Sequence, residues 1–311
     1  MMKKNAYENA EKRISVMEIE RFAIKDGPGI RSTVFLEGCP LHCPWCANPE
    51  SQEIGKKLLY AADRCCGCGT CAAVCPFSAV KMNESGKPEF NRDVCRKCGQ
   101  CVAHCPNGAI TFSGKIMTAG EILDIVLRDK EYYKNSGGGI TFSGGEPFFQ
   151  YEGLAAMLAL SKASYLHTAV ETCGNVPTQY IHEQIDNIDL FLFDVKHSDP
   201  CEFHEITGGN LDLILNNLHY IAAHTGSDVL VRIPVIPGYN DTQKIIGDIF
   251  RIVQDCGIKT VQLLPYHALG VNKYKRLGRP YLLEGVKSLQ KNDLKAFANM
   301  GTEAGLQIIT G

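Results

Sequence analysis

The pattern of apolar and polar positions alternates regularly after Gly114. Short runs rich in Val, Ile, Phe and Thr are separated by longer stretches in which apolar residues recur at helical spacing. The short runs predict strands at Gly139–Ser143, His167–Thr172, Leu190–Val195, Val229–Val235 and Thr260–Leu264. The longer stretches predict helices at Ala119–Lys134, Tyr151–Ala163, Thr178–Ile185, Leu211–His224 and Thr242–Cys256.

An earlier apolar run, Ser32–Leu36, completes a set of six predicted strands. Thr118 and Glu121 have the spacing of a capping box, which supports a helix start directly after Thr118. Strands that alternate with helices in this way indicate an α/β fold with a parallel sheet built from βαβ units. Such sheets carry their functional side chains at the carboxyl ends of the strands.

Composition narrows the class of protein. The 311 residues are 45% hydrophobic and 21% charged, and 32 basic against 34 acidic residues give a net charge of −2. This nearly even balance of charges is unlike that of a nucleic-acid-binding protein, which carries a basic stripe. The first 19 residues are mixed and charged, and no apolar run of about 18 residues occurs, so we expect neither a signal peptide nor a membrane span. We therefore expect a cytoplasmic protein.

The chain contains fifteen cysteines, and eleven of them fall into three spaced groups before residue 106. Clustered cysteines in a reducing compartment indicate metal ligands, whereas disulfides are typical of secreted chains. The remaining four, which we expect to be buried unreactive thiols, are Cys66, Cys173, Cys201 and Cys256.

Two of the groups form an internal repeat with the spacing C-x2-C-x2-C-x3-C-P. The first is Cys65, Cys68, Cys71 and Cys75, and the second is Cys95, Cys98, Cys101 and Cys105. In two-cluster ferredoxins the fourth cysteine of each run ligates the other cluster. We therefore predict one [4Fe–4S] cluster on the first three cysteines with Cys105, and another on the second three with Cys75. A zinc ribbon is the alternative.

A segment of about 55 residues has too small an apolar core to fold without its metal centres. The repeat is thus predicted to be a ferredoxin-like insertion at 57–113. The larger domain would then consist of 1–56, which carries the first cysteine group, and 114–311. The sequence leaves open whether the two insert clusters relay electrons or only shape a docking surface.

The first cysteine group, Cys39, Cys43 and Cys46, has the spacing C-x3-C-x2-C directly after the first predicted strand. Three thiolates can hold three irons of a [4Fe–4S] cube and leave the fourth iron open. An open coordination position is typical of catalytic metal sites. A structural zinc site is the alternative, and it would need a fourth ligand such as His42.

Glycines and polar residues lie at the carboxyl ends of the predicted strands. They are Gly144, Gly145 and Glu146 after the second strand, Glu171 and Thr172 at the third, Asp194 and Lys196 at the fourth, Arg232 in the fifth and His267 after the sixth. Paired glycines let the backbone approach a ligand closely. A carboxylate pair with a hydroxyl suits a monovalent cation or a ribose. Turn glycines, surface ion pairs and a structural histidine are the alternatives.

Taken together, these residues resemble the radical S-adenosylmethionine (SAM) superfamily, and within it the activating enzymes of glycyl radical enzymes. The C-x3-C-x2-C group matches the superfamily signature. The motifs Asp26-Gly27-Pro28-Gly29-Ile30-Arg31 and Trp45-Cys46-Ala47-Asn48-Pro49-Glu50 are similar to those of the activating enzymes. The inserted ferredoxin repeat is typical of the larger activating enzymes and absent from the short pyruvate formate-lyase activase.

The resemblance implies roles for individual residues. The catalytic cluster would be held by Cys39, Cys43 and Cys46. The cofactor contacts would be Trp45 at the adenine; Gly144, Gly145 and Glu146 at the methionine amino group; Glu171, Thr172 and Asp194 around a monovalent cation; and Lys196, Arg232 and His267. The family commonly has Asp where this chain has Glu171. Asp26 would lie in the segment that contacts the partner enzyme.

The resemblance also implies an activity. Reductive cleavage of SAM would give a 5′-deoxyadenosyl radical, which would remove a hydrogen from one glycine of a large glycyl radical enzyme. A partial (β/α)6 barrel would leave a wide mouth for that glycine loop, and an external donor such as flavodoxin or ferredoxin would supply the electron. A peptide-modifying maturase with auxiliary clusters and a plain iron–sulfur electron carrier are the alternatives.

Overall fold

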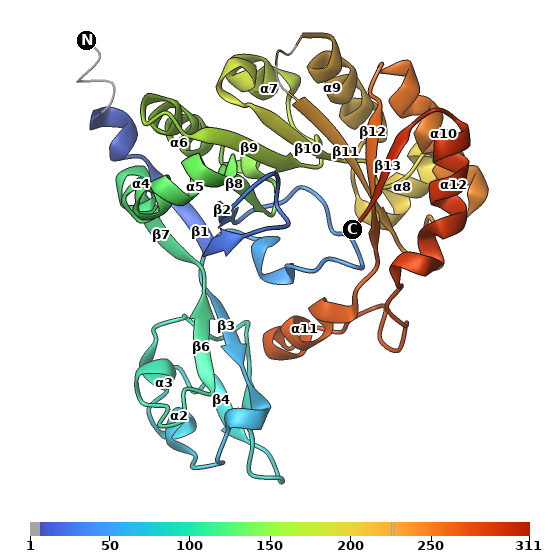
Figure 1. Ribbon diagram of the computed structural model, residues 1–311. Coiled ribbons are helices and arrows are strands. Elements are labelled where there is room, and N and C mark those ends of the chain that lie inside the picture. Colours follow the sequence, from blue (N-terminus) through green and yellow to red (C-terminus); the bar gives the residue numbers. More distant parts are fainter. Residues whose placement is uncertain (1–6, 225, 227) are drawn as a thin grey trace.

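A computed structural model describes residues 7–224, 226 and 228–311. A nine-stranded sheet curves around the larger part of the molecule without closing on itself (Figure 1). In spatial order the strands are β13 (Gln307–Thr310), β12 (Thr260–Pro265), β11 (Asp228–Val235), β10 (Leu190–Asp194), β9 (His167–Thr172), β8 (Gly139–Gly144), β2 (Arg31–Leu36), β1 (Arg13–Ala23) and β7 (Lys115–Thr118). The strands from β13 to β2 are parallel, whereas β1 and β7 are antiparallel to their neighbours.

All six predicted strands are confirmed, and they are consecutive neighbours in the sheet. The structure adds a seventh parallel strand, β13, at one edge and the antiparallel pair β1 and β7 at the other. These three strands lack the apolar run that identified the others. Half of β13 is exposed, and β1 carries several exposed charged and polar side chains. Edge strands with one solvated face give a weak sequence signal.

Helices cover the outer face of the sheet (Figure 1). They are α4 (Ala119–Val126), α5 (Lys130–Ser136), α6 (Tyr151–Ala163), α7 (Thr178–Gln184), α8 (Pro200–Thr207), α9 (Leu211–His224), α10 (Gln243–Asp255) and α12 (Lys295–Glu303). A further helix, α11 (Val271–Leu277), lies apart from these and contacts Lys57–Tyr60 (Figure 1). The capping box predicted at Thr118 and Glu121 is confirmed. The helix predicted at 119–134 is instead two helices, because a 3-10 turn at 127–129 turns the buried Asp129 carboxylate toward Arg21.

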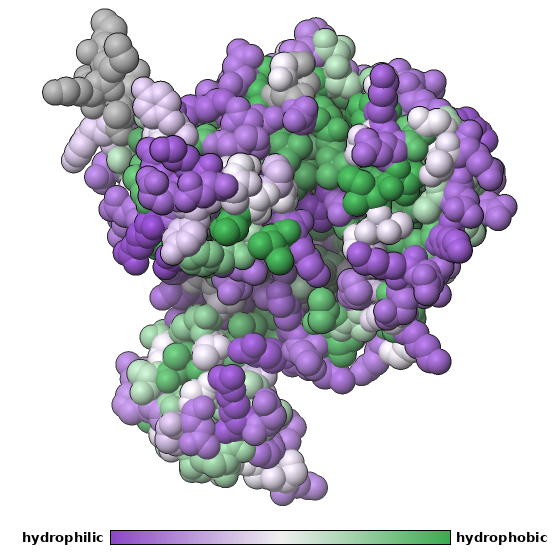
Figure 2. All heavy atoms as spheres, viewed as in Figure 1, coloured by the Kyte–Doolittle hydropathy of each residue, from purple (hydrophilic) through white to green (hydrophobic). Residues whose placement is uncertain are grey.

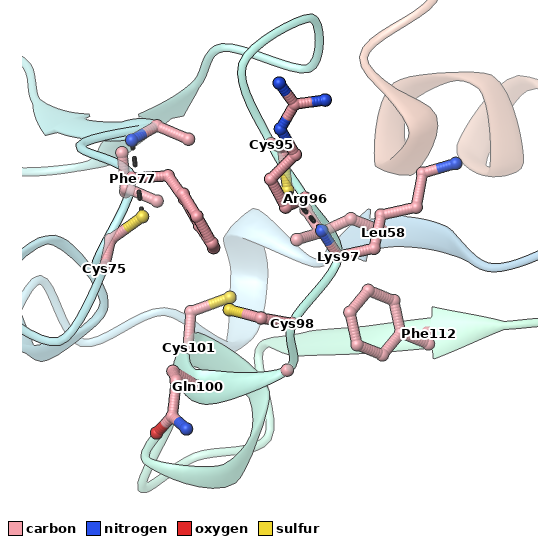
Figure 3. Close-up of a pocket in the computed structure, with 13 residues that line it drawn as sticks. Leu58, Cys75, Phe77, Cys95, Arg96, Lys97, Cys98, Gln100, Cys101 and Phe112 are labelled. Carbon is pink, nitrogen blue, oxygen red and sulfur yellow. Dashed lines mark hydrogen bonds between the residues drawn. The ribbon is translucent and has the colours of Figure 1, made fainter.

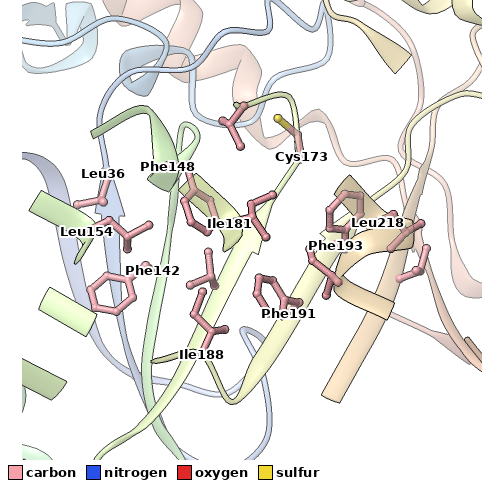
Figure 4. Packing of buried hydrophobic residues seen from close by; sticks show 14 of the residues in the cluster. Leu36, Phe142, Phe148, Leu154, Cys173, Ile181, Ile188, Phe191, Phe193 and Leu218 are labelled. Atoms are coloured by element: carbon pink, nitrogen blue, oxygen red, sulfur yellow. The ribbon is translucent and has the colours of Figure 1, made fainter. Parts of the chain in front are cut away.

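The hydrophobic core lies between the sheet and these helices. Phe142, Phe191 and Phe193 project from β8 and β10 and are completely buried (Figure 4). Leu154 of α6 and Leu218 of α9 pack into the same cluster. Burying side chains of this size contributes about 1.5–3 kcal/mol each. The core therefore fixes the strands whose ends carry the site.

A cysteine-rich lobe extends from one end of the barrel (Figure 1). Its strands are β3 (Lys57–Tyr60), β4 (Val80–Met82), β5 (Pro88–Phe90) and β6 (Ile110–Ser113), and its short helices are α2 (Thr70–Ala73) and α3 (Gln100–Ala103). β3 pairs with β6, and β4 pairs with β5. Lys57 forms a buried ion pair of 2.7 Å with Glu37, which anchors the base of the lobe to the barrel.

None of the helices in the described ranges 7–224, 226 and 228–311 is long and apolar enough to cross a membrane.

Candidate active site

A cavity of about 1060 Å³ occupies the inside of the curved sheet. Figure 2 shows hydrophobic side chains on the walls of the hollow in the larger body, with polar side chains on the surrounding surface. Of the predicted site residues, those that line the cavity are Asp26, Cys39, Cys43, Trp45, Cys46, Gly144, Gly145, Glu171, Thr172, Asp194, Lys196, Arg232 and His267. Residues far apart in the sequence thus face one space.

The three cysteines lie on a loop that leaves the end of β2. Its start is held by two backbone bonds, from Gly38 N to Ser51 O at 2.7 Å and from Cys39 N to Gln52 O at 3.1 Å. Burial raises the pKa of the Cys43 thiol to about 12 and that of Cys46 to about 11. A bound cation would be needed to hold these sulfurs as thiolates at neutral pH.

The site fits an iron–sulfur cube better than zinc. His42, the fourth zinc ligand that the alternative required, is exposed and does not line the cavity. Within the part of the chain that the structure describes, no three His, Cys, Asp or Glu side chains are arranged around a single ion. Ligands of a cube are spread around four irons, so three thiols facing a large cavity suit that cofactor.

Gly144 and Gly145 hold the end of β8 against the cysteine loop. Gly145 N donates to Leu36 O at 2.9 Å, and Glu146 N donates to Gly38 O at 2.8 Å. A Cβ on Gly145 would lie 2.3 Å from Gly38 O, and Gly144 has a φ of +108°. Only glycine allows this approach at both positions. The glycine pair therefore positions the loop that carries Cys39.

Glu146 does not line the cavity, although the motif predicted a cofactor contact for it. Its carboxylate is completely buried and accepts hydrogen bonds from Thr172 Oγ1 at 2.9 Å, Cys173 N at 2.8 Å and Cys173 Sγ at 3.1 Å. Burial raises the pKa of Glu146 above its usual value, against the effect of these donors. The side chain thus joins the ends of β8 and β9.

Four charged side chains form a ladder across β9, β10 and β11. Glu171 Oε1 lies 3.1 Å from Arg232 Nη2, Arg232 Nε lies 3.8 Å from Asp194 Oδ1, and Asp194 Oδ2 accepts from Lys196 Nζ at 2.6 Å. Burial disfavours the charge on Lys196, but Asp194 and the nearby thiols outweigh it and raise the pKa of Lys196. Burial raises the pKa of Glu171, and Arg232 opposes that shift.

The ladder leaves buried polar atoms without partners. Arg232 Nε and Nη1 and Asp194 Oδ1 are inaccessible to solvent and make no hydrogen bond. Unsatisfied groups of this kind cost about 1–3 kcal/mol each, more when they are charged. Because both side chains line the cavity, a polar ligand with donors and acceptors of its own fits beside them.

Trp45, His267 and Asp26 are the other predicted residues on the cavity wall. The Trp45 ring packs edge-on against Tyr239, with 5.1 Å between centroids. His267 is exposed and follows β12. Asp26 is held against the sheet, since its carboxylate accepts from Thr33 Oγ1 at 2.7 Å. The segment around Asp26 therefore forms a fixed edge of the cavity.

Sequence reasoning missed two side chains at the site. Ser143 Oγ donates to Glu171 Oε2 at 2.7 Å, and Cys173 lines the cavity. The hydrogen bond between Cys173 and Cys39 lowers the pKa of Cys39. Each residue is adjacent to a predicted one at a strand end, which was the available signal. Cys66 and Cys201 are exposed, so the expectation that all four unpatterned cysteines are buried was wrong.

In the lobe the eight repeated cysteines gather in two groups. Cys75, Cys95, Cys98 and Cys101 surround one small pocket (Figure 3), whereas the other is surrounded by Cys65, Cys66, Cys68, Cys71 and Cys105. The repeat is also visible in its hydrogen bonds, because Ala79 N donates to Cys75 Sγ at 3.3 Å and Ala109 N donates to Cys105 Sγ at 3.2 Å. The fourth cysteine of each run thus lies with the other run's first three.

Comparison with known families gives three matches. Residues 94–248 match the Radical SAM superfamily, residues 64–110 match a 4Fe-4S dicluster domain, and residues 25–85 match a 4Fe-4S single cluster domain. Among solved structures, Streptococcus suis SuiB bound to precursor peptide SuiA aligns with a TM-score of 0.50 and 14% identity, over 64% of this chain and 43% of that chain. That likeness concerns the fold alone.

Curated relatives align with nearly the whole chain. The choline trimethylamine-lyase activating enzyme of Oleidesulfovibrio alaskensis is 38% identical over 293 residues, 92% of this chain and 94% of the relative. The (2S)-3-sulfopropanediol sulfolyase activating enzyme of Bilophila wadsworthia is 42% identical over 277 residues, 88% of this chain and 91% of the relative. The chain therefore belongs to the glycyl radical enzyme activating enzymes of the radical SAM superfamily.

Proposed function

We propose that Cys39, Cys43 and Cys46 hold a [4Fe–4S] cluster that binds SAM at its open iron. When bound and reduced, this cluster supplies the electron that cleaves SAM, and the 5′-deoxyadenosyl group then removes hydrogen from a glycine of the partner enzyme. The observation that carries the proposal is that the three thiols and the charge ladder line one cavity. Three thiolates complete only three of the four iron corners.

The charge ladder gives the cavity a polarity that suits the methionine end of SAM. Lys196 and Arg232 offer donors to a carboxylate, and the unpartnered Arg232 Nη1 is the strongest candidate. Asp194 Oδ1 is a free acceptor, and with Glu171 and Thr172 it offers oxygens to a monovalent cation. Trp45 presents an apolar wall for the adenine. These residues orient the cofactor, which is the main requirement for selective cleavage.

The shape of the cavity supports a macromolecular substrate. It extends from the cysteine loop to the amino ends of the strands, where His167, Asp228 and Thr260 line it. Its volume of about 1060 Å³ lies at the top of the range of about 300–1,000 Å³ that ligand pockets span. The part of the cavity beside Asp26 suits a peptide loop. Excluding water from that space would protect the reacting radical.

The lobe supports two further clusters and an electron route. We assign residues 57–113 to this domain, with four cysteines for each cluster as the two groups place them. An external donor such as flavodoxin or ferredoxin supplies the electron. Because free thiols and clusters persist in reducing compartments, we assign the protein to the cytoplasm.

The direct test of the cysteine assignment is Cys43→Ala. With one ligand removed, we expect no 5′-deoxyadenosine above background when the anaerobically reconstituted variant is reduced and given SAM. The measurement is product quantitation by liquid chromatography. Cys201→Ser, an exposed cysteine on α8, is the matched control and should keep wild-type product formation. If Cys43→Ala formed as much 5′-deoxyadenosine as the control, the assignment of Cys43 as a cluster ligand would be wrong.

The partner is tested separately. The relatives are named for choline trimethylamine-lyase and for (2S)-3-sulfopropanediol sulfolyase, so these two enzymes are the first candidates. Incubation with reduced protein and SAM should give a glycyl electron paramagnetic resonance doublet on the correct partner. If SAM is cleaved to 5′-deoxyadenosine but no glycyl radical enzyme shows the doublet, a peptide-modifying maturase would be favoured instead.

A further inference from the structure

The short helix α11 connects the cysteine loop of the barrel with the lobe. At its amino end, a Cβ on Gly270 would lie 2.9 Å from Cys46 O, so the helix begins in contact with the catalytic cysteine loop. Lys273 of α11 donates to Asn48 Oδ1 at 2.7 Å and pairs with Glu50 at 3.3 Å. The helix is therefore attached to the segment directly after Cys46.

The same helix contacts the lobe at one of its two cysteine groups. Arg92 Nη2 donates to Arg276 O at 3.2 Å, and Arg92 Nη1 donates to Leu58 O at 2.6 Å. Leu58 lines the pocket formed by Cys75, Cys95, Cys98 and Cys101, which we call the proximal group. Figure 1 shows α11 next to β3, at the base of the lobe. The proximal group thus lies on the side of the lobe that α11 contacts.

Exposed cations surround the proximal group. Arg96 and Lys97 lie between its cysteines in the sequence, and both are exposed beside Cys95 in Figure 3. Lys56 is also exposed, and its Nζ lies 5.7 Å from the Phe112 ring that lines the same pocket. We call Lys56, Arg96 and Lys97 the basic surface.

The other group, Cys65, Cys68, Cys71 and Cys105, also has a cation beside it, because Lys87 Nζ donates to Cys65 O at 2.5 Å. Between its first two cysteines, however, it has Cys66 and Gly67 where the proximal group has Arg96 and Lys97. The two halves of the repeat therefore share their cysteine spacing but differ in charge. A difference confined to one half points to a function of that half that is separate from holding a cluster.

We propose that the basic surface binds an acidic one-electron donor protein, and that electrons enter at the proximal group and continue past α11 to the cluster beside Cys46. This inference rests on the proposed function, because it supplies the electron that the catalytic cluster needs. In the transfer the donor is oxidised by one electron and the proximal cluster is reduced by one, with no bond formed or broken. Opposite charges speed such encounters by about 10- to 1,000-fold at low salt.

The test follows oxidation of photoreduced flavodoxin, a small acidic flavoprotein, by the cluster-loaded protein without SAM, in a stopped-flow instrument. The double variant Arg96→Glu, Lys97→Glu reverses the basic surface. Its matched control, Arg64→Glu with Lys81→Glu, makes the same charge change at exposed positions elsewhere on the lobe. Variants are compared at wild-type iron content, and Arg96→Gln with Lys97→Gln replaces the reversed pair if that pair loses iron.

At low ionic strength we expect the second-order rate constant of the reversed variant to fall about 10- to 100-fold, with the control within about twofold of wild type. Added salt should slow the wild type and leave the reversed variant unchanged or faster, because screening removes the attraction. An unchanged rate in the reversed variant, or an equal fall in the control, would overturn the inference. SAM cleavage with an artificial reductant would stay intact in that case, so the proposed function would survive.

Discussion

Glu146 shows how the surroundings of a single side chain can hold it away from the cavity that its motif borders. Its carboxylate is inaccessible to solvent and accepts hydrogen bonds from Thr172, Cys173 and Phe148. A carboxylate offers only acceptors, so every one of these donors is satisfied at once. The residue therefore joins two strand ends at the site through its acceptor capacity.

We predict that Glu146→Gln destabilises the protein by about 2–3 kcal/mol, because the amide NH2 would face donors that now need an acceptor. Anaerobic denaturant unfolding of the cluster-loaded protein measures this change. Glu152→Gln is the control, since Glu152 is exposed and pairs only with Lys12. Equal stability of the two variants would contradict the role given to the buried carboxylate.

The sequence predicted which residues lie at the site but not how each side chain points. Positions at the ends of parallel strands can be found from periodicity, which is why Glu171, Asp194 and Arg232 were placed together. The direction of Glu146 depends on donors from the next strand, Thr172 and Cys173, and no local pattern encodes that contact. The partners of Arg232 likewise follow from strand register, which only the folded sheet defines.

At the scale of elements, the glycines at the end of β8 determine how closely the cysteine loop approaches the sheet. Strand β8 lies beside β2, and both end at this loop. The six central strands were predictable because each is a buried apolar run. The strands β1, β7 and β13 were not, since they lack such a run. The helix α11 was not predictable either, because it is held by an ion pair with a distant segment and has no strong apolar period.

Substituting alanine for glycine should therefore change the stability of the protein in opposite directions at two positions. Gly145→Ala places a Cβ 2.3 Å from Gly38 O and should lower the free energy of unfolding by about 3 kcal/mol. In Gly247→Ala, on α10, the added Cβ meets nothing closer than 3.8 Å, and the free energy of unfolding should rise by about 0.5–1 kcal/mol. Thermal unfolding under anaerobic conditions compares the two variants. A stabilised Gly145→Ala would show that the loop and the strand end do not need this approach.

At the scale of the whole molecule, the barrel and the lobe are separate parts that are joined by a narrow connection. The lobe has a small core of its own, formed by Leu58, Val80 and Ile110 with two cysteines. It contacts the barrel through the buried pair of Lys57 with Glu37 and through α11. Damage to one lobe cluster should thus leave the catalytic cavity intact.

We predict that Cys68→Ser lowers the iron content by about four atoms per chain, because a cube lost from the lobe carries that many. Cleavage of SAM should persist with an artificial reductant, since the catalytic thiols lie in the barrel. Iron analysis and 5′-deoxyadenosine quantitation measure the two effects, with Cys201→Ser as control. Full loss of cleavage at this reduced iron content would mean that the lobe is part of the catalytic site.

We propose that the cluster held by Cys39, Cys43 and Cys46 has one iron without a protein ligand, and that SAM binds there. Mössbauer spectroscopy of protein reconstituted with iron-57 tests this most directly. Addition of SAM should change the spectrum of a single iron site, and Cys43→Ala should show no such change. Wild-type spectra in which no iron site responds to SAM would contradict the account.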